Sequence, residues 1–477
     1  MKRLLFVLFS VVCMSLYGQD FLATIPVSYA ADTSIVRWYT SQVCVLYTGS
    51  ASNGNHFHLI KTGSGDIYSI EVEEDVTDME ILDDTLYYCG KLNGYFPILY
   101  LIPLQHFYST NVNVKGRKYT PIKDYYPKKL EVFRGTGGVH AVVVGDIVNV
   151  NRTDGFIADF WRIGNSTSWE TEKLLYTDDK ECYDDIAVTD NYVVASGQVV
   201  SNGEIVLRVL DKPGCVRTFM SCFADYDIFY NCDNLNTCEY TTYNYNGDDR
   251  KKIGGHGVYP VSITHTSGDY VVIACMVEKS TSTGMSAKCI KINTSGVPHV
   301  IRNICAWPGY PVNSYLNVRE IRYDSHNDTL LMLVDVLHAG RQKSGIAKID
   351  NAGFSSLLFS YPTVPVASYS IHSIDRGERF GLPTPGCNVF RKICSGTKTM
   401  STSGFSGIWS DALHSDSCSE TDTLGIKDEM GKMEMMRLPA TLFYDFNSYI
   451  VNNSHPVTHN RLHLECGNWR NDSIVED

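Results

Sequence analysis

A strand–hairpin–strand phrase recurs along this chain, and the repetition limits the folds that are open to it. Each copy has an Asp near its start, a run of apolar residues, a polar hairpin and a second apolar strand. A unit of this kind cannot bury both of its faces alone, so its copies must pack against one another. Four copies are clear and two are weaker: 83–104, 189–211, 267–293 and 327–350, with the weaker ones beginning at Ser41 and Gly138.

The spacing of the copies predicts the architecture. Most strand starts recur at intervals close to the ~40–50 residues of one four-stranded propeller blade. Helical periodicity is nearly absent, and Gly-Asp, Asn-Gly and Ser-Gly turns recur at strand-like spacing. We therefore predict an all-β fold, a β-propeller of about seven (six to eight) irregular four-stranded blades. A pair of β-sandwiches is the alternative, which explains the strands but not the return of one phrase.

Several segments depart from the repeat and define the expected domain organisation. Residues 19–445 are expected to form the β-propeller-like domain, with a Cys-containing insertion at about 225–257 and a polar loop at about 396–427. The sequence of this insertion predicts a hairpin. The alternative is that these residues form an extra, degenerate blade. Residues 446–477 are polar and are expected to be a tail or a closing strand.

Residues 1–18 have the organisation of a cleavable secretory signal peptide. Two basic residues precede the apolar run Leu4–Val12, which is too short to span a bilayer. The junction before Gln19 resembles signal-peptidase sites in exported proteins of anaerobic Gram-negative gut bacteria. A lipoprotein anchored at Cys13 is the alternative, although Val12 is bulkier than that motif allows. We expect an exported protein, periplasmic or extracellular at the cell surface, with no membrane span.

Composition narrows the partners and the chemistry. The chain has 41 Lys and Arg against 53 Asp and Glu, a formal net charge of −12, and no basic cluster. This balance argues against binding to nucleic acid or to an anionic membrane. The chain has no P-loop, no HExxH helix and no Gly-x-Ser-x-Gly elbow, so no cofactor is expected.

The cysteines suggest disulfides, because the expected compartment is oxidising. Cys44 and Cys89 lie within apolar strands, where the alternative is a buried thiol that packs as a small hydrophobe. Three close pairs are candidate disulfides: Cys232 with Cys238, Cys275 with Cys289 across one hairpin, and Cys387 with Cys394.

Histidines near the C-terminus form the sharpest metal candidate. A spacing of four places His455, His459 and His463 on one side of a single helix or strand, close to Glu465 and Cys466, as a zinc site could use. A solvated polar tail is the favoured interpretation, because proline follows the first histidine and a secreted cysteine more often forms a disulfide. Similarly, His56 and His58 share one face of a strand. We favour a structural position on a hairpin for them over a role in binding a ligand.

Paired acids are candidates for glycoside hydrolysis, which needs two carboxylates about 5–10 Å apart across a sugar. Adjacent acids on a strand point to opposite faces, and Asp at a strand start usually makes a turn hydrogen bond. We therefore favour turn roles for the three pairs Asp83-Asp84, Asp178-Asp179 and Asp184-Asp185.

Asp-Ser/Thr-aliphatic triplets resemble the O-glycosylation acceptor pattern of exported proteins from the same bacterial group. Turn-to-strand chemistry explains the triplets equally well, because Asp-Thr is ordinary at the entry to an apolar strand. The candidate acceptors are Thr85, Thr329, Thr423 and Ser473.

Tryptophans near predicted loops are candidates for stacking on sugar rings, although most Trp side chains in β proteins fill core. They are Trp38, Trp161, Trp169, Trp307, Trp409 and Trp469.

With its double glycines at 137–138 and 254–255, the repeated phrase resembles exported bacterial β-propeller-like proteins. The expected function is a non-catalytic binding module for a carbohydrate or a surface protein, because variable loops on a rigid sheet core suit recognition. The alternative is a glycan-active enzyme with carboxylates gathered from several blades near the channel. Converging carboxylates favour the enzyme, an exposed aromatic shelf favours sugar binding, and a broad apolar patch favours a protein partner.

Overall fold

The computed structural model describes residues 21–24, 33–40, 43–51, 54–61, 64–92, 95–119, 124–135, 138–149, 152–163, 171–176, 181–199, 205–212, 226–234, 237–239, 258–278, 285–294, 299–306, 315–324, 329–338, 341–349, 355–361, 367–376, 390–400, 404–412, 428–429, 436–437, 442–444, 448–461 and 463–466. The signal peptide candidate lies outside these residues.

Within this part of the chain the fold is all-β, with seven small antiparallel sheets. Sheet 1 starts with β2 (Thr33–Thr40), β3 (Val43–Ser50), β4 (Gly54–Lys61) and β5 (Asp66–Val72). Sheet 2 has β6 (Asp75–Leu82), β7 (Thr85–Leu92), β8 (Tyr95–Pro103) and β9 (Asn111–Tyr119), with the 3₁₀ turn η1 (Leu104–Tyr108) after β8. Sheet 3 has β10 (Asp124–Gly135), β11 (Gly138–Asn149), β12 (Arg152–Ile163) and β13 (Thr171–Tyr176).

The next three sheets are built in the same way. Sheet 4 has β14 (Glu181–Val188), β15 (Tyr192–Val199), β16 (Ile205–Asp211) and β17 (Tyr226–Asn234), extended by β18 (Thr237–Glu239). Sheet 5 has β19 (Val258–His265), β20 (Tyr270–Glu278), β21 (Met285–Asn293) and β22 (His299–Ala306). Sheet 6 has β23 (Tyr315–Asp324), β24 (Thr329–His338), β25 (Arg341–Ile349) and β26 (Ser355–Tyr361).

Sheet 7 joins both ends of the described chain. Its strands β27 (Ala367–Arg376), β28 (Phe390–Met400) and β29 (Gly404–Ala412) are followed in space by β1 (Phe21–Thr24) from the N-terminal side. On its other edge, β1 pairs with β35 (His463–Cys466) from the C-terminal side. One sheet therefore holds three distant parts of the sequence together.

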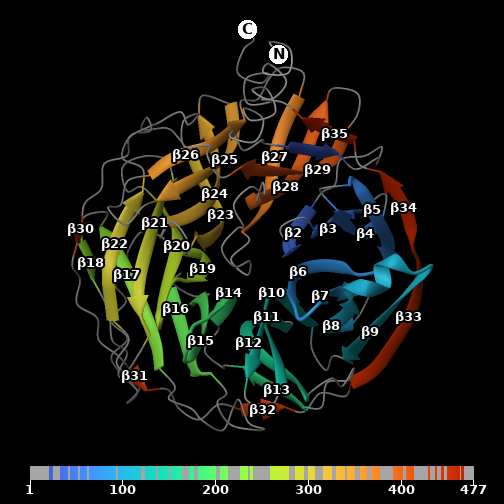
Figure 1. Ribbon diagram of the computed structural model, residues 1–477. Helices are drawn as coiled ribbons and strands as arrows, with labels where there is room; N and C mark the ends of the chain where they lie inside the picture. The colour runs from blue at the N-terminus through green and yellow to red at the C-terminus, as the bar shows by residue number, and fades with distance from the viewer. Residues whose placement is uncertain are drawn as a thin grey trace, which may run out of the picture.

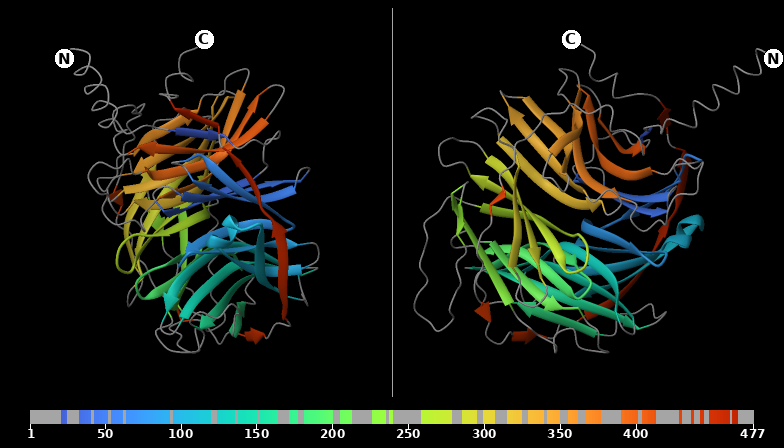
Figure 2. Two further views of the ribbon diagram at one scale, coloured as in Figure 1. Left: turned by 45° about the vertical axis from the view of Figure 1, so that its right-hand side comes forward. Right: turned by 60° about the vertical axis from the view of Figure 1, so that its left-hand side comes forward.

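The sheets are arranged in a ring (Figure 1). The first strand of each sheet contacts the first strand of the next, from β2 through β6, β10, β14, β19 and β23 to β27, and β27 contacts β2 again. The seven first strands therefore surround a common centre, and the later strands of each sheet lie progressively further out (Figures 1 and 2).

A second set of strands follows the outer rim, and we call β30–β35 the outer belt. Each belt strand pairs with the outer edge of a sheet, in the reverse of the sheet order (Figure 1). They are β30 (Asp428–Glu429) on sheet 5, β31 (Met436–Arg437) on sheet 4, β32 (Leu442–Tyr444) on sheet 3, β33 (Ser448–Pro456) on sheet 2, β34 (Thr458–Arg461) on sheet 1 and β35 on sheet 7.

The hydrophobic core lies between neighbouring sheets. Tyr88 and Phe57 pack between sheets 1 and 2, whereas Tyr87 and Phe160 pack between sheets 2 and 3. Successive side chains of β7 therefore face different neighbouring sheets, and both faces are dry. This explains the apolar runs of the repeated phrase, because its two strands are the second and third of their sheet in sheets 1 to 6.

The irregular segments differ from expectation in three ways. The predicted hairpin after Asp225 is present as β17–β18, but β17 is the fourth strand of sheet 4 rather than part of an insertion. The predicted polar loop 396–427 was wrong over 396–412, where parts of β28 and all of β29 extend sheet 7. Of the two alternatives for residues 446–477, the closing strand is observed rather than the tail, but as three strands, β33, β34 and β35, on three different sheets.

Candidate functional site

A β-bulge recurs in the first strands of sheets 2 to 7. The register shifts between Val76 and Asp78 in β6, and the equivalent shift occurs in β10, β14, β19, β23 and β27. A bulge leaves one residue outside the ladder and bends the strand. We call the residues that directly follow the bulge in sheets 2 to 6 the axial residues: Asp78, Lys129, Asp185, Ser262 and Glu320.

The axial residues link each sheet to the next. Asp78 Oδ2 accepts a hydrogen bond from the backbone N–H of Leu130 at 3.0 Å. Asp185 Oδ2 accepts from the N–H of Ile263 at 2.9 Å and from Ser262 Oγ at 2.6 Å. Ser262 Oγ in turn accepts from the N–H next to the sheet 6 axial residue, at 3.1 Å. An acceptor side chain at this position therefore satisfies a buried N–H of the next sheet.

Lys129 breaks this pattern, because an ammonium group cannot accept a hydrogen bond. The N–H of Ile186, which an acceptor on sheet 3 would satisfy, bonds instead to Oδ1 of its own neighbour Asp185 at 2.8 Å. Within the described residues the Lys129 ammonium has no direct hydrogen bond or salt bridge. Burial opposes its charge, but Asp78, Asp185 and Glu320 outweigh this effect and raise the pKa of Lys129.

Arg37 of β2 holds the carboxylates at the other side of the ring centre. Its guanidinium bonds Asp78 Oδ1 and Glu80 Oε1, both at 2.9 Å, and lies 4.0 Å from Glu320. Burial and repulsion by Arg322 disfavour its charge. The three carboxylates outweigh both effects and hold the pKa of Arg37 above its ordinary value.

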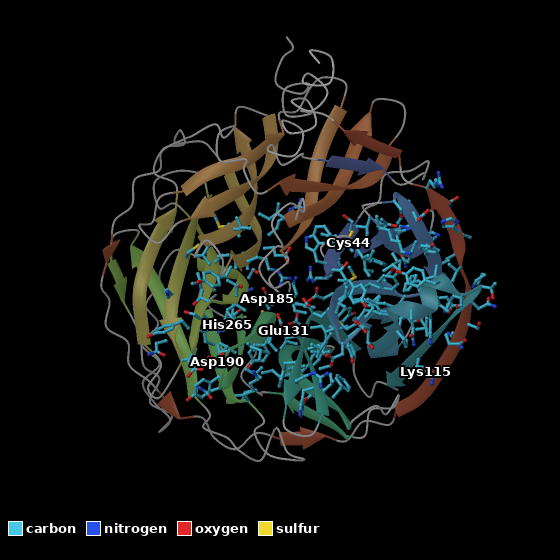
Figure 3. The ribbon with its side chains drawn as sticks, viewed as in Figure 1. Cys44, Lys115, Glu131, Asp185, Asp190 and His265 are labelled. Atoms are coloured by element: carbon cyan, nitrogen blue, oxygen red, sulfur yellow. The ribbon has the colours of Figure 1, made fainter. Side chains whose placement is uncertain are left out.

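Glu131 lies two residues beyond Lys129 on β10, and Figure 3 shows it with Asp185 near the centre of the ring. Burial is the main cause that raises the pKa of Glu131 to about 8, and the negative charge of Glu80 adds to it. A carboxyl group with this pKa carries its proton at neutral pH, so Glu131 is a hydrogen-bond donor there.

This protonation predicts a pH dependence of stability. The folded state keeps the Glu131 proton up to pH about 8, whereas the unfolded chain releases it near the ordinary value of 4.5. The stabilisation is therefore complete below about pH 4.5 and is lost as the pH rises through about 8. Urea unfolding across this range is expected to show a decline that is smaller in Glu131→Gln. An equal slope in both proteins would contradict the assignment.

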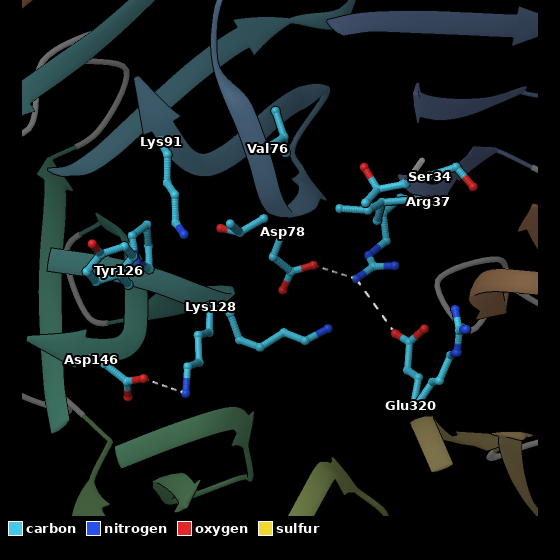
Figure 4. A pocket seen from close by; sticks show the side chains of 15 residues that line it. Ser34, Arg37, Val76, Asp78, Lys91, Tyr126, Lys128, Asp146 and Glu320 are labelled. Atoms are coloured by element: carbon cyan, nitrogen blue, oxygen red, sulfur yellow. Dashed lines mark hydrogen bonds and ion pairs between the residues drawn. The ribbon is translucent and has the colours of Figure 1, made fainter. Parts of the chain in front are cut away.

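A cavity of about 590 Å³ opens beside these residues (Figure 4). Lys91, Tyr126 and Lys128 lie on one side of it, and Arg37 and Glu320 lie on the other. The lining residues come from the beginnings of the first strands and from two second strands: Thr33, Ser34, Ile35, Arg37, Val76, Thr77, Asp78, Lys91, Tyr126, Pro127, Lys128, Lys129, Asp146, Arg319 and Glu320. Most of these side chains are polar or charged, so the cavity suits a ligand rich in donors and acceptors.

An aromatic cluster at the outer edge offers a second candidate surface. Tyr68 packs edge-on against Tyr108 with ring centroids 5.0 Å apart, and His459 stacks on Tyr68 at 4.8 Å. Lys61 Nζ lies 4.3 Å from the centroid of the Tyr108 ring. These contacts cover the ring faces, so the cluster is not the open aromatic shelf that sugar stacking requires.

The structure separates the histidines that were proposed as a metal site. His455, His459 and His463 lie on β33, β34 and β35, which pair with three different sheets, so they do not share one side of a single strand. His56 and His58 do share a face, and their rings stack. The buried His58 ring contacts Thr48 and Ser69, and burial lowers its pKa to about 3, which indicates a structural role.

One predicted disulfide is wrong. Cys275 is opposite Lys288 and Cys289 is opposite Ala274 across the β20–β21 pair, and Cys289 is a buried thiol. The two cysteines are therefore offset by one residue of register rather than directly opposite each other. Cys44 and Cys89 are buried thiols, as the alternative interpretation predicted. Of the other candidates, only the backbone of Cys232, Cys238 and Cys394 is described, and Cys387 lies outside the described residues.

The predicted turn at Asp83-Asp84 is confirmed, because both residues have positive φ between β6 and β7. Thr85 is buried, and its hydroxyl donates to the Asp83 carbonyl, which favours the turn interpretation over modification. Asp185, by contrast, lies at a bulge rather than at a turn. Side chains of Thr329, Thr423 and Ser473, and residues 178–179, are outside the described part of the chain.

Trp38 is 3% exposed and belongs to the core. The side chains of the other five candidate tryptophans are outside the described set: Trp161, Trp169, Trp307, Trp409 and Trp469.

The described residues contain no helix with the length and hydropathy that crossing a bilayer requires. Comparison with protein-family models finds none that matches this chain. Comparison with curated proteins finds no similar one.

Proposed function

We propose that the protein is an exported seven-bladed β-propeller that binds a carbohydrate in the cavity at the centre of its ring, without catalysing a reaction. Seven sheets with a closed ring of first strands support the architecture. The basic and apolar organisation of residues 1–18 supports export to the periplasm or the cell surface.

The exception at Lys129 is the observation that carries the binding role. An acceptor at this position would serve the fold, as Asp78, Asp185 and Ser262 do. Lys129 cannot accept the hydrogen bond from the backbone N–H of the next sheet. Its three N–H donors instead lie unused beside a polar cavity. A sugar has hydroxyl groups that accept hydrogen bonds from such donors.

A protein partner is less well supported. A docking surface for a protein usually contains a broad exposed apolar patch. In the described part of the chain Tyr108, at 47%, is the exposed large hydrophobic residue, and it belongs to the covered aromatic cluster.

The enzymatic alternative is also less well supported, although carboxylates do converge at the ring centre. Asp78 and Glu80 bond to Arg37, and Asp185 bonds to sheet 5. Glu320 bonds Arg322 at 2.7 Å. Glycoside hydrolysis by two carboxylates needs a second acid beside Glu131, and these four are engaged in holding the fold.

A glycan-array screen with a parallel assay for released reducing ends tests the proposal. We expect binding without product, and we expect Lys129→Met to weaken binding by about tenfold or more, because charged hydrogen bonds contribute about 1.5–3 kcal/mol. Lys61→Met, which changes a lysine of the outer aromatic cluster, is the matched control. Released product, or equal binding by Lys129→Met and Lys61→Met, would refute the proposal.

A further inference from the structure

The charge of the central cavity is opposite to that of the whole protein. The chain has a formal net charge of −12. Five cationic and three carboxylate side chains line the cavity: Arg37, Lys91, Lys128, Lys129 and Arg319 against Asp78, Asp146 and Glu320. Glu80 and Asp184, which lie outside the lining, pair with Arg37 and Lys128, so the cations that matter for a ligand are those without such a salt bridge.

The structural pairs account for only part of this excess. Arg37 is bonded to acids of β6, and Lys128 bonds Asp146 and Asp184, both at 2.7 Å. Lys91 and Lys129 make no salt bridge with any described residue. They approach the cavity from two neighbouring sheets, because Lys91 is on β7 and Lys129 is on β10.

We propose that the sugar bound in the central cavity is anionic, and that its carboxylate or sulfate group lies between the ammonium groups of Lys91 and Lys129. This inference rests on the proposed carbohydrate-binding function and names the substrate class of the same site.

The acids around Lys129 leave its donors available. Asp78 is engaged by Arg37 and the N–H of Leu130, and Asp185 by Ser262 and the N–H of Ile263. The axial acids therefore balance the ammonium charge without using its hydrogen bonds.

Lys91 is held in position by an aromatic ring. Its Nζ lies 4.4 Å from the centroid of the Tyr126 ring, a cation–π contact that restrains the flexible lysine stem. The same ring lines the cavity. An anionic sugar can therefore bond its charged group to a Lys91 ammonium that is already held beside the cavity.

Calorimetric titrations with four trisaccharides test the inference. The probes are a galacturonic acid trisaccharide, its methyl ester, a sulfated galactose trisaccharide and the neutral galactose trisaccharide. We expect at least one charged probe to bind about tenfold or more tightly than the neutral one, and added salt to weaken only the charged probes. Preference for the galacturonate over its ester identifies a carboxylate site, and preference for the sulfated probe identifies a sulfate site.

Variants of the two lysines complete the test. Lys129→Met and Lys91→Met are each expected to remove most of the preference for charge, whereas Lys61→Met keeps it. Lys91→Met removes the cation–π contact with Tyr126 but no hydrogen bond or salt bridge between described residues, so it remains informative if Lys129→Met does not fold. Equal affinity for charged and neutral probes would overturn this inference and leave the proposed function standing. Absence of any glycan binding in the array would overturn the proposed function as well.

Discussion

Replacing Arg37 with methionine is expected to lower the free energy of unfolding by about 3–5 kcal/mol at neutral pH, which is the usual cost of breaking a buried ion pair. Arg37 is 2% exposed, and it is the cation that Asp78 and Glu80 both contact. Methionine fills much of the same volume but removes the cation that bonds both carboxylates, and Arg322, 4.0 Å from Glu80, compensates their charge only in part. Burial of an uncompensated charge, rather than loss of packing, is therefore the expected cause.

The pH dependence of this variant tests the cause. Without Arg37 the two carboxylates are buried without the cation that bonds them, and taking up a proton removes this buried charge, so acidic pH favours the folded variant. The deficit relative to wild type is expected to shrink as the pH falls toward about 5 and to grow above about 7. Urea unfolding at a series of pH values measures it.

Arg134→Met is the matched control for Arg37→Met. Arg134 also bonds an acid, Asp83 at 2.8 Å, but its side chain is 70% exposed. Exposed ion pairs contribute only about 0–1 kcal/mol. Two results would contradict the electrostatic explanation: equal losses in the free energy of unfolding for the two variants, or a loss for Arg37→Met that does not change with pH.

Ending the chain after Asp445 is expected to abolish cooperative folding and to cause aggregation. The truncation removes β33, β34 and β35, which cover the outer edges of sheets 2, 1 and 7. β33 pairs with β9 along all nine of its residues. Exposed sheet edges pair with other chains, and sheet 7 loses the strand that secures β1.

Size-exclusion chromatography and thermal unfolding measure this effect. Asn460→Ala in β34 is the control, because β34 is exposed along its length and its backbone pairing with β5 does not need the side chain. A truncated protein that elutes as a monomer and unfolds at the wild-type temperature would show that the outer belt does not contribute to closure.

The repeated phrase predicted the middle strands well for a physical reason. β7 and its equivalents are buried on both faces, so every residue in the run must be apolar or small, and the run is visible in one dimension. The first strands were harder to recognise, because each has a bulge and a polar axial residue that interrupt the alternation. The sequence left residues 446–477 open between a polar tail and a closing strand, because strands such as β34 make backbone pairs but bury no side chains.

The central site was largely missed. Asp185 was noted only as part of an acidic pair, and Arg37, Lys129 and Glu131 carried no local signal. A weak signal did exist on the partner strand. A Cβ on Gly145 or Gly197 would overlap the backbone carbonyl of Tyr126 or Cys182, so glycine in the second strand marks the bulge in the first.

By itself the sequence determined the all-β class, the positions of the six central hairpins and the acidic composition, because these follow from local hydrophobic patterning and bulk charge. Only the tertiary structure decided that six sheets would receive an outer strand from the C-terminal segment and that residues as distant as Arg37 and Glu320 would share one charged centre. Ring closure makes both possible: contacts between sheets depend on the register of every strand between them, and no short window of sequence contains that information.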